Sequence, residues 1–222
     1  MLIKNLRREH ILVANWIKKG SRVLDLGCGD GSFLAALRTE KQVSGYGIEI
    51  DPTNIEACIK NSVNVLQTNL DNGLHDFEND SFDYVVMSQT IQAINKPYEV
   101  IDEMLRIGKE VIVTFPNMGH WKCRLQFLMG KMPVTTHLPN TWYSTPNIHM
   151  CTVRDFNNLC EEKNININNL CSIKAEKTCG YLWNTKVSVQ RYIQRNLFLS
   201  SGGNIAFRCL TYFGNLYLSV RP

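Results

Sequence analysis

Hydrophobic and polar positions follow one another in blocks that predict strands and helices in turn. Short apolar runs predict buried strands, and apolar residues spaced three or four positions apart predict helices. Strands are expected at 23–26, 43–50, 63–67, 82–87 and 111–115, and helices at 33–39, 51–59 and 97–107. Because strand and helix alternate, we expect a doubly wound, mostly parallel α/β sheet.

The pattern is less regular after residue 116. The expected elements are a short helix at 121–129, a long loop at 131–150, a helix at 153–163 capped by Thr152, and strands at 165–173 and 216–220. At the N-terminus, residues 1–20 are typical of an amphipathic helix. Long loops inside compact domains usually serve a function. We find no repeat or linker, so residues 1–222 are expected to form a single domain.

Composition narrows the function classes. The 222 residues, 44% apolar and 20% charged, suit one globular α/β domain with a sizeable core. A net charge of +4 without a dense basic run argues against a nucleic-acid partner. No apolar segment approaches the roughly 20 residues of a membrane span, and the N-terminus is too charged for a signal peptide. We therefore expect a protein that does not enter membranes.

The eight cysteines predict neither disulfides nor a metal site. None forms a C-x-x-C pair, and no histidine stands beside them at metal-ligand spacing. Several lie in apolar segments, where a free cysteine behaves as a small hydrophobic residue. The simplest interpretation is a reducing cytoplasm and no bound metal, which we favour over a zinc site assembled from the late cysteines.

The chemistry centres on the glycine loop, the sequence GCGDG at residues 27–31 directly after the first expected strand. Glycines lack a Cβ, so the main chain can come close to a ligand. Twenty residues after Gly29, the second expected strand carries Glu49. Nucleotide-binding α/β folds place an acid at this position for ribose hydroxyls. The spacing therefore predicts a ligand that contains a ribose.

The loop sequence disfavours a phosphate-bearing nucleotide. Ser32 stands where a dinucleotide fingerprint requires glycine, and Asp30 brings a negative charge to the place of a diphosphate. The chain also lacks the G-x-x-x-x-G-K-[ST] motif of ATP and GTP sites. A ligand with a ribose, a positive centre and no phosphate fits better. S-adenosylmethionine, with its ammonium and sulfonium groups, has these properties.

The stretch VLDLGCGDG, together with Glu49, resembles the first motif and the ribose-binding acid of class I S-adenosylmethionine-dependent methyltransferases. This resemblance implies a Rossmann-like sheet of seven strands with the last strand inserted antiparallel.

Later motifs narrow the resemblance: MSQTIQA at 87–93, FPNMGHW at 115–121, KMPVT at 131–135 and TWYSTPNIHMCTVRDF at 141–156. Together they resemble the MetW family of methionine biosynthesis proteins, over about residues 16–159. The resemblance implies S-adenosylmethionine as cofactor, with S-adenosylhomocysteine as its product form, and homoserine O-acyltransferase as partner. It gives no guide to segment 181–214, where we favour an ordinary helix and hairpin over a partner surface.

The resemblance also implies residue roles. Gly27 and Gly29 would lie against the methionine part, Glu49 would take the ribose hydroxyls and Ile50 would pack on the adenine. Asp25 would organise the loop, with direct or indirect contact to the cofactor both open. The full expected cofactor site is Asp25, Gly27, Cys28, Gly29, Glu49, Ile50, Asn69, Leu70 and Ser88.

One position departs from the family pattern. Relatives usually have Gly-Asp before the leucine at the adenine edge, and this chain has Thr68-Asn69. An asparagine carbonyl can still accept a hydrogen bond from the adenine amino group, but without a charge. We therefore expect weaker cofactor binding rather than its loss.

No general base is evident. The polar candidates near the strand ends are Gln89, Gln92, Asn117, His120, Tyr143 and His149. For His120 we favour a bond that anchors its turn over a substrate contact, and for His149 a bond that pins the long loop. Tyr143 and its neighbour Trp142 could equally form a lid, a partner-facing patch or a local anchor.

Two functions follow. In the first, the protein binds S-adenosylmethionine and acts with homoserine O-acyltransferase in methionine biosynthesis. In the alternative, it is a small-molecule S-adenosylmethionine-dependent methyltransferase whose loop 131–150 closes over the acceptor. Fold alone does not choose between them, because function lies in the site.

Overall fold

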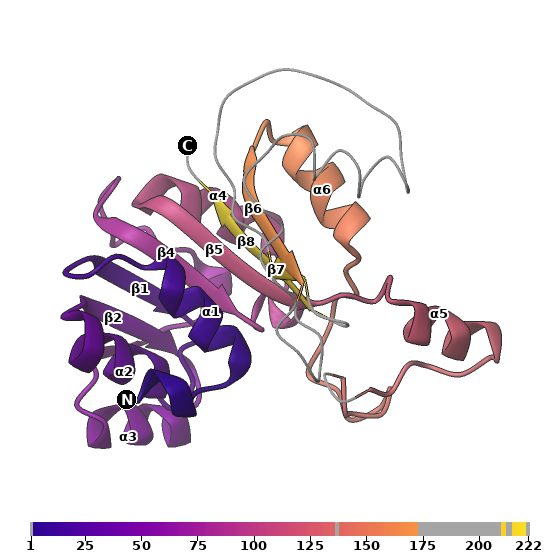
Figure 1. The fold of residues 1–222 in the computed structure, drawn as a ribbon, viewed down its shortest axis with the longest axis horizontal. Coiled ribbons are helices and arrows are strands. Elements are labelled where there is room, and N and C mark those ends of the chain that lie inside the picture. Colours follow the sequence, from indigo (N-terminus) through magenta and orange to yellow (C-terminus); the bar gives the residue numbers. More distant parts are fainter. Residues whose placement is uncertain (1, 136–137, 173–209, 212–214, 221–222) are drawn as a thin grey trace.

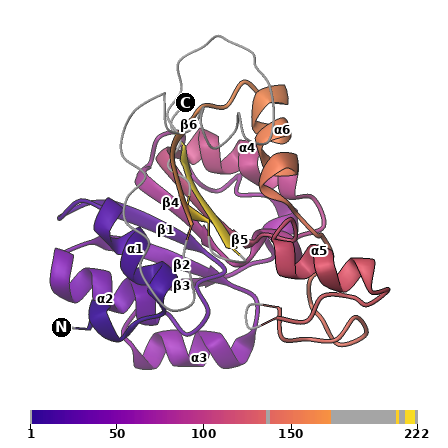
Figure 2. The same cartoon turned by 45° about the vertical axis from the view of Figure 1, so that its right-hand side comes forward.

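The computed structural model describes residues 2–135, 138–172, 210–211 and 215–220, and shows one sheet covered by helices on both faces (Figures 1 and 2). The strands are β1 (Arg22–Leu26), β2 (Ser44–Glu49), β3 (Val65–Gln67), β4 (Phe82–Ser88), β5 (Gly108–Pro116), β6 (Ile167–Ser172), β7 (Leu210–Thr211) and β8 (Asn215–Val220). The helices are α1 (Arg8–Trp16), α2 (Ser32–Lys41), α3 (Pro52–Lys60), α4 (Pro97–Ile107), α5 (Trp121–Leu128) and α6 (Val153–Glu162). Short 3₁₀ turns are η1 (Ile3–Asn5), η2 (Leu70–Asn72) and η3 (Ile91–Ala93).

The strand order is β3-β2-β1-β4-β5-β8-β6-β7, and the first five strands are parallel. This confirms the doubly wound sheet. β8 pairs antiparallel with both β5 and β6, the direction expected of the last strand. The described residues form eight strands rather than seven, because the two-residue β7 adds to the edge of β6. The order reverses between β1 and β4, so the carboxyl ends of these strands face the ligand-binding crevice of such sheets.

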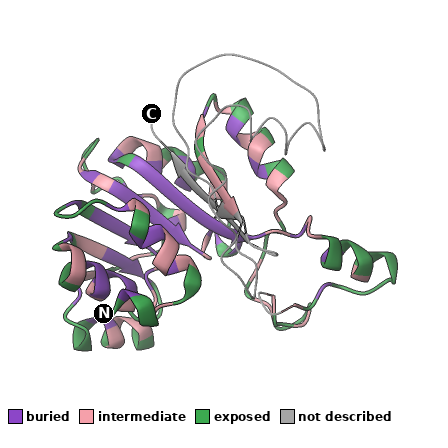
Figure 3. Cartoon of the chain, viewed as in Figure 1, coloured by how far each residue is buried: buried purple, intermediate pink, exposed green. Residues whose placement is uncertain are grey.

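Alternation along the strands produces two cores. On one face Leu24 and Leu26 of β1 pack with α4 and α6, while on the other Val23 packs with α1, α2 and Cys58 of α3. Successive side chains of a strand point to opposite faces, so each central strand feeds both cores. Burial of β1, β4 and β5 is nearly continuous in Figure 3, as expected for parallel strands covered on both sides.

Several boundaries differ from the sequence predictions. The N-terminal helix expected over 1–20 is broken into η1 and α1, because Leu6 is extended between them. The strand expected at 63–67 is shorter in the structure, where β3 includes only Val65–Gln67. Helix α6 begins as predicted, since Thr152 and Asp155 form a reciprocal capping box. The predicted strand at 165–173 is β6, with Ile173 outside the described residues, and the helix and hairpin favoured for 181–214 also lie outside them apart from β7.

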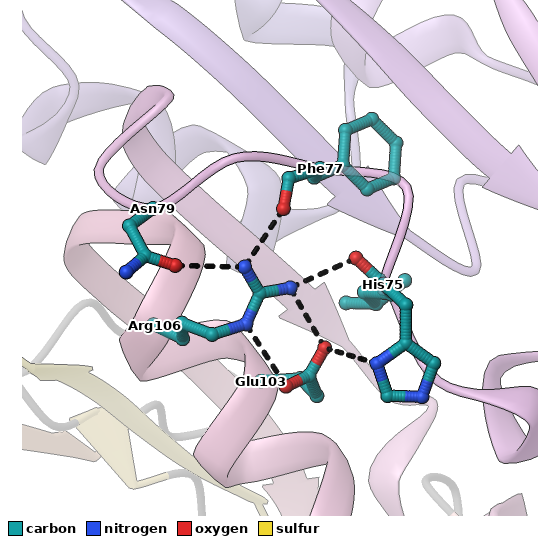
Figure 4. Close-up of polar contacts among 6 residues, drawn as sticks. His75, Phe77, Asn79, Glu103 and Arg106 are labelled. Carbon is teal, nitrogen blue, oxygen red and sulfur yellow. Dashed lines mark hydrogen bonds and ion pairs between the residues drawn. The ribbon is translucent and has the colours of Figure 1, made fainter.

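A single arginine holds the loop that leads from η2 to β4. Arg106 on α4 donates to the carbonyls of Phe77 (2.7 Å) and Leu74 (3.0 Å) and pairs with both oxygens of Glu103 at 3.0 and 2.8 Å (Figure 4). It also donates to Asn79 Oδ1 at 2.9 Å. A planar guanidinium offers five donors in a fixed fork, which suits several acceptors around one point. This arginine therefore fixes the segment that enters β4 against the C-terminal end of α4.

Replacing Arg106 with lysine should lower the free energy of unfolding by about 2 kcal/mol, because an ammonium cannot reach five acceptor atoms on four residues at once. Urea unfolding followed by circular dichroism measures the change. Arg124→Lys is the matched control, since Arg124 is exposed on α5, and it should change stability by less than about 0.5 kcal/mol. Equal effects of both substitutions would contradict the role given to the Arg106 contacts.

Candidate functional site

The glycine loop satisfies its own main-chain amides. Gly27 N and Cys28 N both donate to Ile48 O on β2, at 2.8 and 3.0 Å. The first amide of α2, Ser32 N, donates to Asp30 Oδ1 at 3.0 Å. These amides therefore do not offer the cradle that a diphosphate needs at a helix N-terminus. This geometry agrees with the argument from sequence against NAD, FAD, ATP and GTP.

Glu49 connects the end of β2 to the glycine loop. Its Oε2 accepts from Gly29 N at 2.8 Å, and its Oε1 accepts from Ile50 N (2.8 Å) and Asp51 N (3.0 Å). The residue is buried, with 8% exposed, whereas the neighbouring Ile50 is 57% exposed. An acid with remaining acceptor capacity beside an exposed apolar side chain suits a ribose joined to an aromatic base.

Asp25 on β1 is a buried carboxyl group, 2% exposed, beneath the glycine loop. Its Oδ1 has no hydrogen-bond partner among the described residues. Burial raises the pKa of Asp25 to about 7, with the charge of Arg7 acting against the rise and that of Glu49 adding to it. A buried acceptor without a donor is costly, so this oxygen is where a cationic group of a ligand would be best accommodated.

Gly27 is required by both conformation and space. Its φ is +74°, and a Cβ at this position would lie 2.4 Å from Oγ1 and 2.7 Å from Cγ2 of Thr90. Thr90 is itself held by a bond from its Oγ1 to Ser88 O at 3.1 Å. The loop therefore packs directly on the chain that leaves β4.

Gly27→Ala should destabilise the fold by about 3 kcal/mol and weaken ligand binding, because the methyl group would displace Thr90. Gly20→Ala is the control, since Gly20 has nearly the same φ of +76° but nothing within 4 Å of its Cβ position. It should cost only about 1 kcal/mol. Thermal or urea unfolding of both variants separates the clash from the conformational cost, and equal losses would refute the clash.

Cys28 contributes its main chain rather than its side chain to this site. Its thiol turns into the core beneath the loop, 3.7 Å from the thiol of Cys58 and against Gly47. Burial raises the pKa of both thiols, so both remain protonated. The six cysteines that the structure describes are all free.

The side chains expected at the adenine edge and at the end of β4, those of Asn69, Leu70 and Ser88, make contacts within the protein. Asn69 Oδ1 accepts from Asp71 N at 3.0 Å and so caps η2, and Leu70 is buried in the core. The oxygen proposed for the adenine amino group is therefore already in use as a cap. Ser88 is also buried, with its hydroxyl 3.3 Å from Thr114 Oγ1. Its side chain thus faces β5.

The catalytic candidates hold the loops that follow β4 and β5. Gln89 has a φ of +58°, and its N donates to Thr114 Oγ1 at 2.9 Å. His120 caps α5, accepting from Lys122 N at 3.3 Å, which agrees with the favoured anchoring role. His149 Nε2 lies 3.2 Å from Asn95 O and pins the long loop, also as favoured.

Gln92 is the candidate with an unsatisfied atom. Its main-chain O accepts from Ile148 N (2.8 Å) and His149 N (3.0 Å), and its Nε2 donates to Gln89 O. Its Oε1 is buried and has no hydrogen-bond partner within the described ranges. The residue borders a mainly apolar pocket between β5 and the long loop. The lining residues are Gln92, Phe115, Pro116, Met118, Met132, Pro133, Leu138, Asn140, Thr141, Trp142, Thr145, Asn147, His149, Met150 and Cys151.

Tyr143 and Trp142 are exposed and meet edge to face, with ring centroids 5.6 Å apart. Asn117 Oδ1 accepts from Gly119 N at 2.9 Å and so holds the turn after β5. No group of three or more histidine, cysteine or acidic residues that could hold a metal occurs among the described residues. Within the same residues, no helix is long and apolar enough to cross a membrane.

Three residues that shape the candidate site were not predicted from the sequence. They are Arg7, Thr90 and Thr114. Arg7 acts on Asp25 from the residue before α1, and nothing in the local sequence indicates that approach. Thr114 receives hydrogen bonds from Gln89 and lies beside Ser88. Its hydroxyl within the apolar run 111–115 was the one available indication.

Comparison with known proteins shows which family this chain belongs to. The profile of the family described as "Methionine biosynthesis protein MetW" matches residues 7–199. The chain is 34% identical over 171 residues to the "Bifunctional methionine biosynthesis protein MetXA/MetW" of Rhodopirellula baltica, covering 72% of this chain and 27% of that protein. The chain thus spans about a quarter of the length of this curated relative.

Solved structures share the fold at low identity. A chain from the structure described as "Complex between the Haloferax volcanii Trm112 methyltransferase activator and the putative methyltransferase" is 16% identical, with a TM-score of 0.62 over 99% of this chain and 90% of that one. A possible histamine N-methyltransferase from Thermotoga maritima is 15% identical, with a TM-score of 0.60 over 96% and 86%. The fold is therefore that of class I methyltransferases, and the chain belongs to the MetW family of methionine biosynthesis proteins.

Proposed function

We propose that this MetW protein binds S-adenosylmethionine in the crevice between the glycine loop, Glu49 and Ile50. The observation that carries the proposal is the buried Asp25 Oδ1, which lacks a hydrogen-bond donor in the described structure and lies beneath the loop. An ammonium group would supply that donor, with a charge of the right sign.

The rest of the cofactor fits the residues around this point. The ribose hydroxyls would compete with Gly29 N for Oε2 of Glu49, and the adenine would lie on the exposed Ile50. The internally bonded amides of residues 27 and 28 suit a ligand without phosphate. Cys28 would contribute only backbone, and the capping role of Asn69 supports an affinity lower than in relatives with an acid there.

We further propose that the protein acts with homoserine O-acyltransferase. The name of the Rhodopirellula baltica relative joins MetXA and MetW in one chain, and this supports the acyltransferase that the family resemblance implies as the partner. Binding of the pathway's downstream product, S-adenosylmethionine, would then regulate the acyltransferase. This regulation requires a coupling free energy of only about 1–3 kcal/mol between the two binding events.

Methyl transfer to a small molecule is the second candidate. The apolar pocket at the end of β5 and the unpartnered Gln92 Oε1 favour it, because they would accept an apolar molecule with one hydrogen-bond donor. However, among the described residues the only histidine that lines this pocket is His149, which is bonded to Asn95 O, and the described lining includes no acid or lysine. A general base is therefore not evident, which places the binding and regulatory function first.

Isothermal titration of S-adenosylmethionine and S-adenosylhomocysteine into the purified protein tests the cofactor site. We expect both to bind. Absence of binding to the native protein would overturn the cofactor proposal. Acyltransferase turnover measured with and without the MetW protein, at several S-adenosylmethionine concentrations, then tests the regulatory role. Turnover that does not respond to the MetW protein would leave methyl transfer as the better proposal.

A further inference from the structure

Helix α5 displays an apolar stripe to solvent. Trp121, Leu125 and Leu128 recur at i, i+4 and i+7, and their side chains are 56%, 47% and 85% exposed. Cys123 lies on the opposite side of the helix and is buried. This arrangement reverses the usual surface helix, whose apolar stripe faces its own core. Apolar anchors at this spacing are typical of helices that dock into a groove of another protein.

The loop that follows extends the exposed surface. Figures 1 and 2 show α5 and the succeeding loop standing away from the sheet, and Figure 3 shows how exposed they are. We call residues 121–135 and 138–150 the arm. Its exposed large apolar side chains are Trp121, Leu125, Phe127, Leu128, Met129, Met132, Val134, Trp142, Tyr143, Ile148 and Met150. Large exposed apolar patches usually mark an interaction site.

The arm is also strictly basic. No Asp or Glu occurs between Glu110 and Asp155, whereas the arm carries Lys122, Arg124 and Lys131. Residues 1–110 carry the opposite balance, with twelve Lys and Arg against sixteen Asp and Glu. The arm therefore complements a partner surface that is apolar at its centre and acidic at its edge.

We propose that the arm is the docking surface for homoserine O-acyltransferase, which would receive the α5 stripe in an apolar groove bordered by acidic side chains. This inference rests on the proposed function for the identity of the partner. Charge disfavours two other docking places for this arm, namely the arm of a second copy and the C-terminal part of the chain. The arm of a second copy is equally basic, and residues 155–222 contain eight Lys and Arg against four Asp and Glu.

The arm also lies next to the pocket at the end of β5. Met132 and Trp142 line that pocket and are at the same time exposed on the arm. A partner bound to the arm would therefore lie against the outer wall of the pocket. This contact gives a physical path by which partner and ligand could affect each other's binding.

The test is surface plasmon resonance of the full-length protein against immobilised homoserine O-acyltransferase from the same organism. The double variant Trp121→Ser/Leu128→Ser should bind at least about 30-fold more weakly, the size typical of interface hot spots. Lys122→Glu/Arg124→Glu should slow association and flatten its dependence on salt. The matched controls Ile59→Ser and Lys60→Glu, both exposed on α3, should leave binding unchanged.

The possible failures are distinguishable. If the native protein does not bind the acyltransferase, the partner named in the proposed function is wrong. If the native protein binds and the arm variants bind equally well, that function stands and the docking surface is elsewhere.

Flotation with vesicles containing anionic lipid and sedimentation of the free protein test the other occupants. Arm-dependent binding to vesicles, or arm-dependent self-association, in place of acyltransferase binding would overturn the proposal. Unchanged circular dichroism and melting temperature exclude misfolding of the variants.

Discussion

The stability of the Asp25→Asn variant, measured relative to the native protein, should be greater at pH 8 than at pH 4. The same substitution should remove most of the affinity for S-adenosylmethionine. The unfolded Asp25 ionises near pH 3.8, whereas burial raises the folded pKa to about 7. Between these values unfolding releases a proton, so the stability of the native protein falls as pH rises from about 4 to about 7 and then levels off. Asparagine has no such proton to lose.

The difference in unfolding free energy between variant and native protein should therefore increase by up to about 4 kcal/mol from pH 4 to pH 8. Urea unfolding at a series of pH values, without cofactor, measures it. Asp83→Asn is the control of opposite sign. Its carboxylate accepts from Arg22 N at 2.9 Å, and this bond holds the pKa of Asp83 below its usual range. That substitution should lower stability by a nearly constant amount between pH 4 and pH 8, and its cost should shrink only below about pH 4, where the native carboxylate takes up its proton. A pH-independent difference for Asp25→Asn would contradict the assignment of a neutral buried acid.

The same substitution should weaken S-adenosylmethionine binding at pH 8 by about 100-fold, because a charge-assisted bond to the ammonium is lost. In the native protein, affinity should fall as pH drops below about 7, since the protonated Asp25 no longer carries the complementary charge. Titration calorimetry at pH 6 and pH 8 tests both statements. An affinity that is unaffected by the substitution would mean that the ammonium binds elsewhere.

Glu49→Ala should abolish measurable cofactor binding, with a loss on the order of a thousandfold, because two charge-assisted bonds to the ribose disappear. It should also lower stability by about 3 kcal/mol, since Gly29 N, Ile50 N and Asp51 N all lose their acceptor. Calorimetric titration and urea unfolding measure the two effects.

Two companion variants make this result specific. Glu49→Gln keeps one acceptor oxygen and should fall between the native protein and the alanine variant in both measurements. Glu56→Ala removes an exposed acid on α3 and should change neither. Full cofactor binding by Glu49→Ala would refute the ribose assignment.

The periodic part of the fold was predictable because the strands are continuous apolar runs. β1, β4 and β5 are buried on both faces, and such runs stand out from their flanking turns. The same argument located the glycine loop and Glu49 at adjacent strand ends. It could not find β7, whose two residues are too few to form a pattern and are ordered by pairing with β6.

Side-chain directions in the site were less predictable, because they depend on tertiary contacts. Asn69 and Ser88 occupy the expected positions, but the oxygens of their side chains contact Asp71 N and Thr114. Likewise the thiol of Cys28 turns toward Cys58, thirty residues away in sequence. A motif fixes where the main chain of a residue lies, whereas the choice of rotamer is made by neighbours from other elements.

The self-satisfied amides of the glycine loop have a kinetic consequence. Because Gly27 N and Cys28 N are bonded to Ile48 O, the loop backbone at these residues loses little conformational entropy on binding, and only the contact of Gly29 N with Oε2 of Glu49 has to yield to the ribose. Cofactor association should then be a single bimolecular step, with an observed rate linear in ligand concentration and no slower isomerisation phase. The loop behaves as a rigid receptor, and discrimination between S-adenosylmethionine and S-adenosylhomocysteine would arise in the dissociation rate.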